Sequence, residues 1–431
     1  MNQQLVTPGD KAMPAQEESR RRSVAILVDD LVTWLVAGHQ PSGIQRVVSE
    51  LLDTAYARLD IRGWPAVLTG GLRADEGTRL VEITPDSLHW EVHRGGPRRE
   101  LRALTRARRV IVRLPMPRSA RWRAKAVYAR FALSFGQVRV LSTGASLRPD
   151  LLLVPGAFWS SGSSGRLQRL AEQGVAVRLI VYDLFPVRNP EWVGPQMRRD
   201  FEDGLDALAP VCDRIVTLSQ EVADQVAERY PGSAAHIRVA IPTLRAHAPK
   251  PSLARDEVLA PPAGPFILAV STVDPRKNHR VILDAWRLVR QEPRAAGARL
   301  VIAGRQGWRA DDIEAEIARE AERLGIVRLD NATDHVVEAL YRDCVATVLA
   351  SWAEGFGLPA RESIARGIPT LMSSTIPRDG LPAGTYSTFD PADAHALAEL
   401  IVEAIAAGPV RTPIALGEGT GWEPVLSALV D

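Results

Sequence analysis

Short apolar runs alternate with helical patterns along most of this 431-residue sequence. In the first half, residues 24–28 form an apolar, β-branched run, and the apolar residues from Ile44 to Tyr56 recur with the spacing of one helical face. Further strands are predicted at residues 110–112, 151–154, 178–182 and 214–218. Alternation of this kind indicates βαβ units, in which parallel strands are buried beneath helices on both faces of a sheet.

The second half repeats the pattern after a proline-rich segment. Residues 246–265 contain five prolines and show little periodicity, which is typical of an interdomain linker. Strands are predicted after it at residues 266–270, 300–303, 326–329, 346–349 and 370–372. Helices are predicted between them at residues 278–291, 311–324, 334–343, 358–366 and 391–406.

The alternation predicts an α/β protein with two Rossmann-like, doubly wound domains that face a central cleft. The predicted divisions are a disordered tail at 1–22, an N-terminal domain at 23–245, the linker at 246–265 and a C-terminal domain at 266–412. Residues 413–431 are expected to pack back on the N-terminal domain. Because ligands bind beyond the carboxyl ends of the strands in such sheets, the loops at those ends are expected to line the cleft.

Composition excludes several classes of protein. The two cysteines, Cys212 and Cys344, cannot form a disulfide scaffold. No apolar run reaches the roughly 18–20 residues that a membrane-spanning helix needs. The first 22 residues are polar and lack the apolar core of a secretory signal. We therefore expect a cytoplasmic protein.

A strongly basic stretch interrupts the N-terminal domain. Residues 94–130 hold twelve arginines and one lysine against a single acid, Glu100, although the whole chain has a net charge of only +2. An amphipathic helix that packs on the N-terminal domain explains this stretch, and so does a peripheral contact with the inner face of the cell membrane. No zinc-finger or RNA-binding signature accompanies the basic residues, so a nucleic-acid partner is not expected.

Two acids and two glycines follow the strand predicted at 346–349. Glu354, Gly355 and Gly357 lie in the loop, and Glu362 lies about one turn into the next helix. Glycines let a backbone approach a ligand closely at a helix N-terminus, and ionised carboxylates accept hydrogen bonds, which suits the hydroxyls of a sugar. A tight strand-to-helix turn with two solvated acids explains the spacing equally well.

A pair of cations follows the strand predicted at 266–270. Arg276 and Lys277 come just before Asn278, which the pattern places at the N-cap of the next helix. Cations at that end of a helix oppose its dipole, and the arrangement makes sense if a phosphate binds there. The alternative is a solvated pair of cations.

Two features of the first half point toward the same cleft. Asp183 follows the strand predicted at 178–182, although it could simply cap the loop there. Gly43 lies between Ser42 and Gln45, which have capping-box spacing, so we expect Gly43 in the first turn of a helix. Its amide could face a diphosphate, or the segment could do no more than start the helix.

Other nucleotide-binding classes lack their motifs here. No G-x-G-x-x-G follows the first strand, so a dinucleotide-dependent dehydrogenase is not expected. No Walker lysine follows a glycine-rich loop, which argues against a P-loop ATPase.

In their order along the chain, these stretches resemble glycosyltransferase family 4, the retaining nucleotide-sugar transferases of GT-B fold that are also called glycosyl transferases group 1. The matching residues are FILAVSTVDPRKN at 266–278, LVIAGRQG at 300–307, DHVVEALY at 334–341 and the E-x7-E of Glu354 and Glu362. A weaker match covers GIQR at 43–46 and YDLFP at 182–186.

The resemblance implies a role for each matching residue. Arg276 and Lys277 would hold the diphosphate of the donor, Glu362 its ribose, and Glu354 a hydroxyl of the donor sugar. Further contacts with the donor would come from Gly43, Ser271, Gly355, Phe356, Gly357 and Leu358. The implied catalytic set is Arg276, Lys277, Glu354 and Asp183.

Two positions depart from the family's pattern. Many relatives have glycine where Ser271 stands, and many have histidine, which contacts the donor sugar, where Tyr182 precedes Asp183. Neither change removes the phosphate-binding pair of cations.

The implied activity is transfer of a hexose from a nucleotide-diphosphate sugar to a saccharide or lipid-linked saccharide, with retention of configuration. Mannose from GDP-mannose and a hexose from a UDP donor are both open. No metal or other cofactor is expected, and surface polysaccharide biosynthesis is the expected setting. The alternatives are another GT-B enzyme, such as a sugar-nucleotide epimerase or a phosphorylase, and a non-catalytic module that binds sugar nucleotides.

Overall fold

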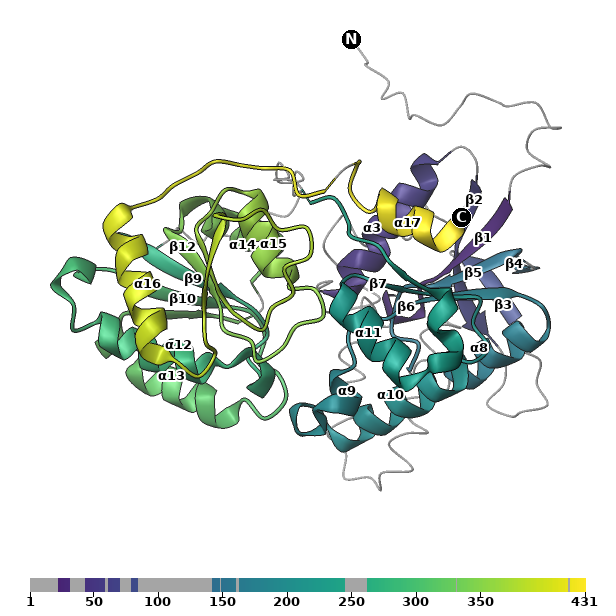
Figure 1. Cartoon of the computed structure of the whole chain (residues 1–431), viewed down its shortest axis with the longest axis horizontal. Helices are drawn as coiled ribbons and strands as arrows, with labels where there is room; N and C mark the ends of the chain where they lie inside the picture. Colours follow the sequence, from purple (N-terminus) through teal and green to yellow (C-terminus); the bar gives the residue numbers. More distant parts are fainter. Residues whose placement is uncertain are drawn as a thin grey trace, which may run out of the picture.

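Two lobes, each built on a β-sheet, lie side by side in the computed structural model (Figure 1). The structure describes residues 22–31, 43–58, 61–69, 79–83, 142–147, 149–159, 163–244, 262–330, 332–417 and 419–431. The basic stretch at 94–130, with the strand predicted at 110–112, lies outside the described residues, as do residues 1–21 of the tail and 246–261 of the linker.

The N-terminal domain is built on an eight-stranded sheet with the order β4-β3-β2-β1-β5-β6-β7-β8. Its strands are β1 Arg22–Leu27, β2 Ile61–Thr69, β3 Arg79–Ile83, β4 Ser142–Leu147, β5 Leu151–Val154, β6 Ala176–Ile180, β7 Arg214–Thr217 and β8 Ile237–Val239. Strand β3 pairs antiparallel with both of its neighbours, and the other described pairings in this sheet are parallel. The described helices are α3 Ile44–Ala57, α8 Ser163–Glu172, α9 Phe185–Arg188, α10 Pro195–Leu208 and α11 Gln220–Arg229.

The C-terminal domain is built on a six-stranded parallel sheet with the order β11-β10-β9-β12-β13-β14. Its strands are β9 Phe266–Val270, β10 Arg299–Ala303, β11 Ile326–Leu329, β12 Ala346–Leu349, β13 Thr370–Ser373 and β14 Tyr386–Phe389. Its helices are α12 His279–Val289, α13 Asp311–Leu324, α14 Asp334–Asp343, α15 Leu358–Ala365 and α16 Ala394–Ala407. The predicted α/β class with two doubly wound domains is confirmed.

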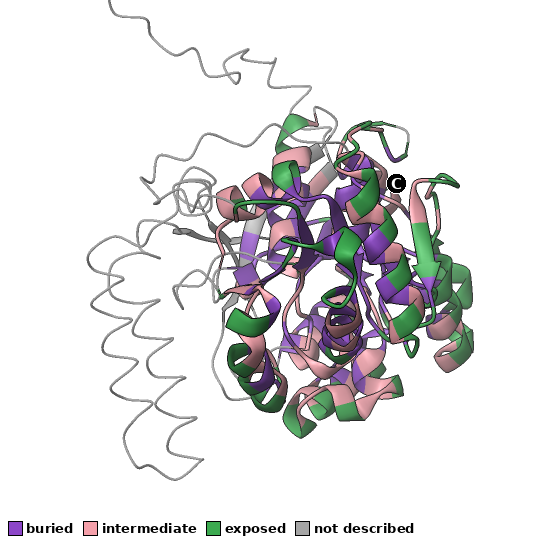
Figure 2. Ribbon diagram, turned by 90° about the vertical axis from the view of Figure 1, so that its left-hand side faces the viewer, coloured by how far each residue is buried: buried purple, intermediate pink, exposed green. Residues whose placement is uncertain are grey.

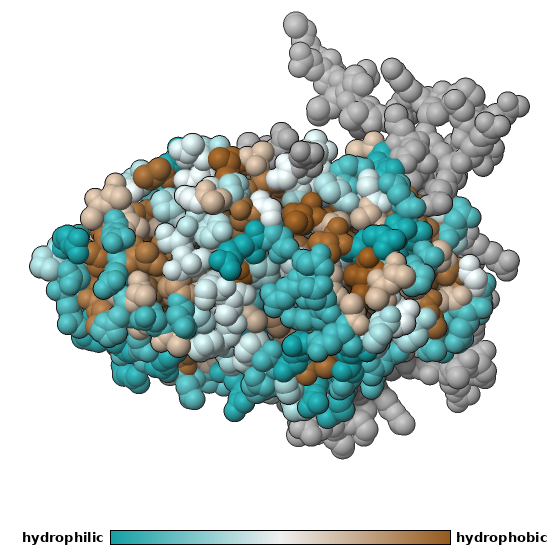
Figure 3. Space-filling view, viewed as in Figure 1, coloured by the Kyte–Doolittle hydropathy of each residue, from teal (hydrophilic) through white to brown (hydrophobic). Residues whose placement is uncertain are grey.

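The two domain cores are buried under helices, and some apolar contacts cross between the domains. Buried residues gather in the sheets and on the helix faces turned toward them, and exposed residues lie on the outer helix faces (Figure 2). On the face seen in Figure 3 the surface is mostly hydrophilic, with apolar residues in small, separate patches. Phe356 and Ile364 of the C-terminal domain join a cluster that also contains Val47 and Leu51 of α3. This shared cluster holds the two lobes against each other.

Two predicted helix starts are wrong in detail. Gly43 is the N-cap of α3 with φ of 49°, not a residue of the first turn, and the Gln45 side chain donates to Asp30 Oδ2 at 2.8 Å instead of closing a capping box. Asn278 does occupy the N-cap of α12, but its backbone is left-handed, with φ of 52°. Its side chain donates to the carbonyl of Pro391 at 2.7 Å, so it does not cap the helix. In both cases a tertiary contact takes the polar group that local spacing would use for capping.

The last helix, α17 Glu423–Val430, packs on the N-terminal domain. In Figure 1 the chain leaves α16 in one lobe, crosses to the other and ends beside α3. Arg58 donates to Glu423 Oε1 at 3.2 Å and to Ser427 Oγ at 3.1 Å, and Arg178 donates to the carbonyl of Leu429 at 2.6 Å. The chain therefore links the two domains twice.

The strand order places a topological switch point in each sheet. Strand β9 lies between β10 and β12, and β1 lies between β2 and β5, so chain connections leave in opposite directions on either side of each central strand. Loops that diverge in this way open a crevice for ligands at the carboxyl ends of the strands. Of the helices in the described ranges, none is long and apolar enough to cross a membrane.

Candidate active site

The predicted pair of cations lies at the switch point of the C-terminal sheet, directly after β9. A short 3-10 helix, Pro275–Lys277, carries Arg276 and Lys277, and Asp274 caps it by accepting from the amide of Lys277 at 3.1 Å. The cap holds the two cations on one rigid turn. The loop after β12 contacts this turn, because the amide of Trp352 donates to the carbonyl of Arg276 at 2.8 Å.

Glu354, from the loop after β12, binds both cations. Arg276 Nη1 lies 2.8 Å from Glu354 Oε2, and Lys277 Nζ contacts Glu354 Oε1. The hydroxyl of Ser351 donates to the same Oε1 at 2.6 Å. A carboxylate offers about four acceptor positions, so Glu354 retains acceptor capacity on Oε2 for a ligand hydroxyl.

The charges in this cluster depend on one another. Burial opposes ionisation of Glu354, but Arg276 and Lys277 outweigh it and lower the pKa of Glu354 to about 2. Burial and the neighbouring Arg276 lower the pKa of Lys277, and the charge of Glu354 opposes that shift. Glu354 is therefore ionised at neutral pH. Its negative charge offsets positive charge on the two cations.

Asp183 approaches the same cluster from the N-terminal domain. It is partly buried, and desolvation raises its pKa. The charge of Arg276 lowers that pKa, and the charge of Glu354 raises it. Phe185, two residues later, stacks its ring against the guanidinium of Arg276 at 4.7 Å. The structure thus brings together the four residues predicted to be catalytic, Asp183, Arg276, Lys277 and Glu354.

Gly355 lies at the direct contact between the domains. A Cβ at this position would lie 1.8 Å from the carbonyl oxygen of Tyr182, so only glycine fits this conformation. Ser219 adds a hydrogen bond across the interface, since its hydroxyl donates to the carbonyl of Gly355 at 2.7 Å. Tyr182 itself is partly buried, and its hydroxyl donates to the carbonyl of Pro155 at 2.7 Å. In this conformation the Gly355 backbone lies close to the backbone of the other domain, where the sequence had predicted close approach to a ligand.

Glu362 has a separate set of partners. Arg46 Nη2, on α3 of the N-terminal domain, donates to Glu362 Oε1 at 2.9 Å, and the hydroxyl of Tyr341 lies 3.4 Å from Oε2. The Glu362 side chain is 14% exposed. Both predicted acids face the interface between the domains, but they lie in different hydrogen-bond networks.

The other residues predicted to bind a donor take varied positions. Phe356 is buried, with the guanidinium of Arg361 4.0 Å from its ring, so its backbone alone is suited to face a ligand. Gly357 is the N-cap of α15 with φ of 74°, and a Cβ there would lie 2.8 Å from Ile376. Leu358 is the first residue of α15 and is partly buried, whereas nothing lies within 4 Å of a Cβ built on Gly43.

Ser271 is held by a histidine that sequence reasoning did not identify. Ser271 Oγ lies 3.2 Å from His279 Nε2. Burial, aided by the charge of Arg328, lowers the pKa of His279 to about 3, so its imidazole is neutral. In the sequence, His279 could have been identified by its position directly after Lys277-Asn278, at the start of α12.

Asp30 is a second residue that the motifs missed. It follows β1 at the switch point of the N-terminal sheet, and burial raises its pKa, although the hydrogen bond from Gln45 opposes the shift. In the sequence, Asp30 could have been identified as an acid that follows the first strand. No group of three or more histidines, cysteines or acids placed to hold a metal ion is found in the described ranges.

Residues 264–407 match the model of the family described as glycosyl transferases group 1. The C-terminal domain belongs to this family. The predicted family is therefore confirmed, on a match that covers one domain of the chain.

Curated relatives that this chain matches include several named transferases. Serotype-specific mannosyltransferase WbdA of Escherichia coli is 29% identical over 222 residues, which are 48% of this chain and 27% of WbdA. O-antigen chain mannosyltransferase B of Escherichia coli is 30% identical over 141 residues, or 32% of this chain and 36% of that protein. D-inositol 3-phosphate glycosyltransferase of Nocardiopsis dassonvillei is 27% identical and covers 69% of this chain and 73% of its own. The chain spans about a quarter of WbdA's length.

Solved structures share the fold over nearly the whole chain. Sucrose-phosphate synthase from Thermosynechococcus elongatus has a TM-score of 0.54 at 17% identity and covers 94% of this chain and 97% of its own. Anabaena HepE in complex with UDP-glucose has a TM-score of 0.52 at 13% identity and covers 90% of this chain and 93% of its own. These likenesses show that the glycosyl transferases group 1 domain is part of a GT-B fold, as predicted.

Proposed function

We propose that this chain is a glycosyltransferase that moves a hexose from a nucleotide-diphosphate sugar to a saccharide, with retention of configuration. The observation that carries the proposal is the cluster of Arg276, Lys277 and Glu354 at the switch point of the C-terminal sheet, with Asp183 facing it from the other domain. The names of the mannosyltransferase relatives support mannose as the hexose.

The cations are suited to the leaving group. Arg276 presents a planar fork that matches two phosphate oxygens, and Lys277 presents a point charge. Both side chains are largely buried, at 19% and 11% exposure, so little water screens their charge. In the absence of a donor, the Glu354 carboxylate balances part of the positive charge of Arg276 and Lys277. When a diphosphate binds, its negative charge also balances these cations, and the remaining acceptor position of Glu354 accepts a hydrogen bond from a sugar hydroxyl.

The proposed reaction needs no nucleophile from the protein. The bond between the anomeric carbon and the diphosphate oxygen breaks, its electron pair stays on the diphosphate, and the acceptor hydroxyl forms the new bond on the same face of the sugar. A phosphate oxygen takes the hydroxyl proton. Cations fixed where the negative charge develops are commonly worth several kcal/mol, because they do not have to reorganise during the step. We propose that neither a metal ion nor another cofactor takes part.

The acceptor and the setting are proposed on broader grounds. The O-antigen mannosyltransferase among the relatives supports surface polysaccharide biosynthesis, with a saccharide or a lipid-linked saccharide as acceptor. Such an acceptor fits a cytoplasmic location with peripheral membrane contact through the basic residues at 94–130.

Release of nucleoside diphosphate from GDP-mannose, UDP-glucose, UDP-galactose and UDP-N-acetylglucosamine tests the proposal. We expect one donor to be cleaved, with unchanged rates in the presence of EDTA and with the anomeric configuration retained in the product. Lys277→Ala should lower kcat/KM by at least about tenfold. Arg294→Ala, which removes an exposed cation outside the cluster, is the control and should not change it. Binding of a donor without any release would contradict catalysis, and wild-type rates from Lys277→Ala would contradict the role of the cluster.

A further inference from the structure

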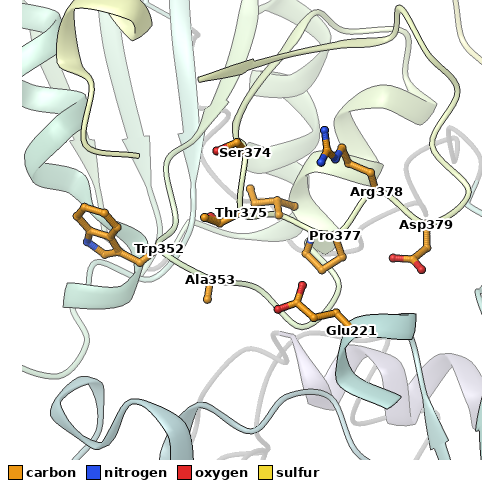
Figure 4. Close-up of a pocket in the computed structure, with 9 residues that line it drawn as sticks. Glu221, Trp352, Ala353, Ser374, Thr375, Pro377, Arg378 and Asp379 are labelled. Atoms are coloured by element: carbon orange, nitrogen blue, oxygen red, sulfur yellow. The ribbon is translucent and has the colours of Figure 1, made fainter. Parts of the chain in front are cut away.

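A pocket of about 440 Å³ lies between the two domains (Figure 4). One of its lining residues, Ala353, directly precedes Glu354 of the cluster with Arg276 and Lys277. Trp352 stands at one end of it, and Arg378 and Asp379 stand at the other, with Ala353 and Thr375 between them. The volume lies within the range of pockets that take small ligands.

Both domains form this pocket. Its main wall comes from the loops after β12 and β13, and Glu221 of α11 adds a carboxylate from the N-terminal domain. The amide of Gln220 donates to Asp379 Oδ1 at 3.2 Å, which joins the two sides at the pocket's edge. A ligand bound there would contact both domains.

The main wall is rigid. Arg361, a buried side chain of α15, donates to the carbonyls of Asp379 at 2.7 Å and Pro377 at 3.3 Å. The hydroxyl of Thr375 donates to the carbonyl of Ser351 at 2.9 Å, which ties the loop after β13 to the loop after β12. Because these contacts are made without a ligand, little ordering is needed when one binds.

The pocket and the proposed reaction centre share a contact at Ala353. Ala353 lines the pocket, and the carbonyl of Ala353 accepts from Arg276 Nη1 at 2.9 Å. The next residue, Glu354, is the carboxylate between the two cations. A group that contacts Ala353 in the pocket is therefore bound beside Glu354, the residue proposed to contact the donor sugar.

The lining suits an uncharged, polyhydroxylated ligand. Trp352 is 39% exposed, so its indole offers an apolar surface to one face of a sugar ring. The carboxylates of Glu221 and Asp379 accept hydrogen bonds from hydroxyls, and the Ser374 and Arg378 side chains can donate them. Two carboxylates face a single cation, so a phosphate or a nucleotide is disfavoured. Burial and the charge of Asp379 raise the pKa of Glu221, which is consistent with two acids sharing one space.

We propose that this pocket binds the terminal sugar of the acceptor saccharide, with Trp352 and Glu221 as its main contacts. The assignment rests on the proposed transfer activity, because only a transferase needs a second sugar beside the donor. It separates the two substrates: the cations hold the donor, and the pocket between the domains holds the acceptor.

Saturation-transfer NMR with disaccharides that end in mannose, glucose or galactose measures binding to this pocket without catalysis. We expect at least one of the three to bind the wild type and to bind at least about tenfold more weakly to Trp352→Ala. Glu221→Gln, from the other domain, should also weaken binding. The control is Tyr56→Ala, because Tyr56 is likewise 39% exposed but lies on α3, outside the pocket. No signal with the wild type, or equal binding to Trp352→Ala and Tyr56→Ala, would overturn the assignment.

Transfer kinetics separate failure of this assignment from failure of the proposed activity. Trp352→Ala should raise the acceptor KM by about tenfold and leave the donor KM and the slow release of nucleoside diphosphate into water unchanged. A raised donor KM instead would assign the pocket to the donor and overturn the inference. If no sugar nucleotide is cleaved by the wild type, the proposed activity fails, and the NMR experiment still decides whether the pocket binds saccharides.

Discussion

Arg46 of α3 and Glu362 of α15 form an ion pair across the domain interface at 2.9 Å, although 316 positions separate them in the sequence. Glu362 is the residue expected to bind the ribose of the donor, so its partner in this conformation belongs to the opposite domain. Arg46 is 41% exposed, and solvent screening limits such a pair to no more than about 1 kcal/mol. A nucleotide can therefore compete with Arg46 for Glu362 at small cost.

Glu362→Ala and Arg46→Ala should have different effects on nucleotide binding. If Glu362 holds the ribose, Glu362→Ala should weaken binding of GDP or UDP by at least about tenfold, and Arg46→Ala should change it by no more than about threefold. Isothermal calorimetry on both variants makes the comparison. A loss in Arg46→Ala as large as that in Glu362→Ala would mean that Arg46 itself contacts the nucleotide.

Glu354→Gln should destabilise the C-terminal domain by about 3 kcal/mol, because removing one partner of a buried ion pair leaves the other charges uncompensated. Arg276 and Lys277 would then repel each other in a site where Glu354 is only 8% exposed. Urea denaturation followed by circular dichroism measures the change.

Adding Lys277→Met to Glu354→Gln should recover part of the loss. Glu403→Gln, on the exposed face of α16, is the control for removal of an acid. A change no larger than that of Glu403→Gln would contradict the coupling.

The stability difference between the wild type and Glu354→Gln should depend on pH. The folded pKa of Glu354 is about 2, below its ordinary value of 4.5, so the carboxylate stabilises the folded state fully above 4.5 and loses its effect as pH falls toward 2. We therefore expect a constant difference from neutral pH down to about pH 5, and about half of it or less by about pH 3. Denaturation midpoints across this range provide the measurement. A difference that stays constant to about pH 3 would show that the cations do not hold this acid ionised.

Gly355→Ala should abolish closure of the domains while leaving each domain folded. The added Cβ would lie 1.8 Å from the carbonyl oxygen of Tyr182, and Gly355 is not among the glycines with positive φ, so the clash lies only between the domains. Small-angle scattering should show a larger radius of gyration, and transfer activity should fall at least about tenfold. Gly232→Ala, where a Cβ meets nothing within 4 Å, is the matched control. An unchanged radius with wild-type activity would show that this interface is not needed for catalysis.

Local sequence patterns predicted the C-terminal domain well. The bounds predicted for β9, β11, β12, α13 and α14 match the structure to the residue. These strands are short apolar runs buried in a parallel sheet, and the two helices begin and end at clear changes of periodicity, so local burial alone determines them. The strands β8 and β14 were missed because they are edge strands of three and four residues, largely exposed, and give no buried run. Strands β2, β3 and β4 were missed as well.

For the site, the sequence by itself determined which residue types meet at the switch point. Cations after one strand and acids after another must converge there, because parallel strands end at the same edge of a sheet. Only the tertiary structure decided the partners: Glu354 with Arg276 and Lys277, Glu362 with Arg46, and Gly355 against Tyr182. The first contact joins loops that follow two different strands of the C-terminal sheet. The other two join the domains, and they depend on a placement that apolar contacts between the domains help to set rather than any local run of sequence.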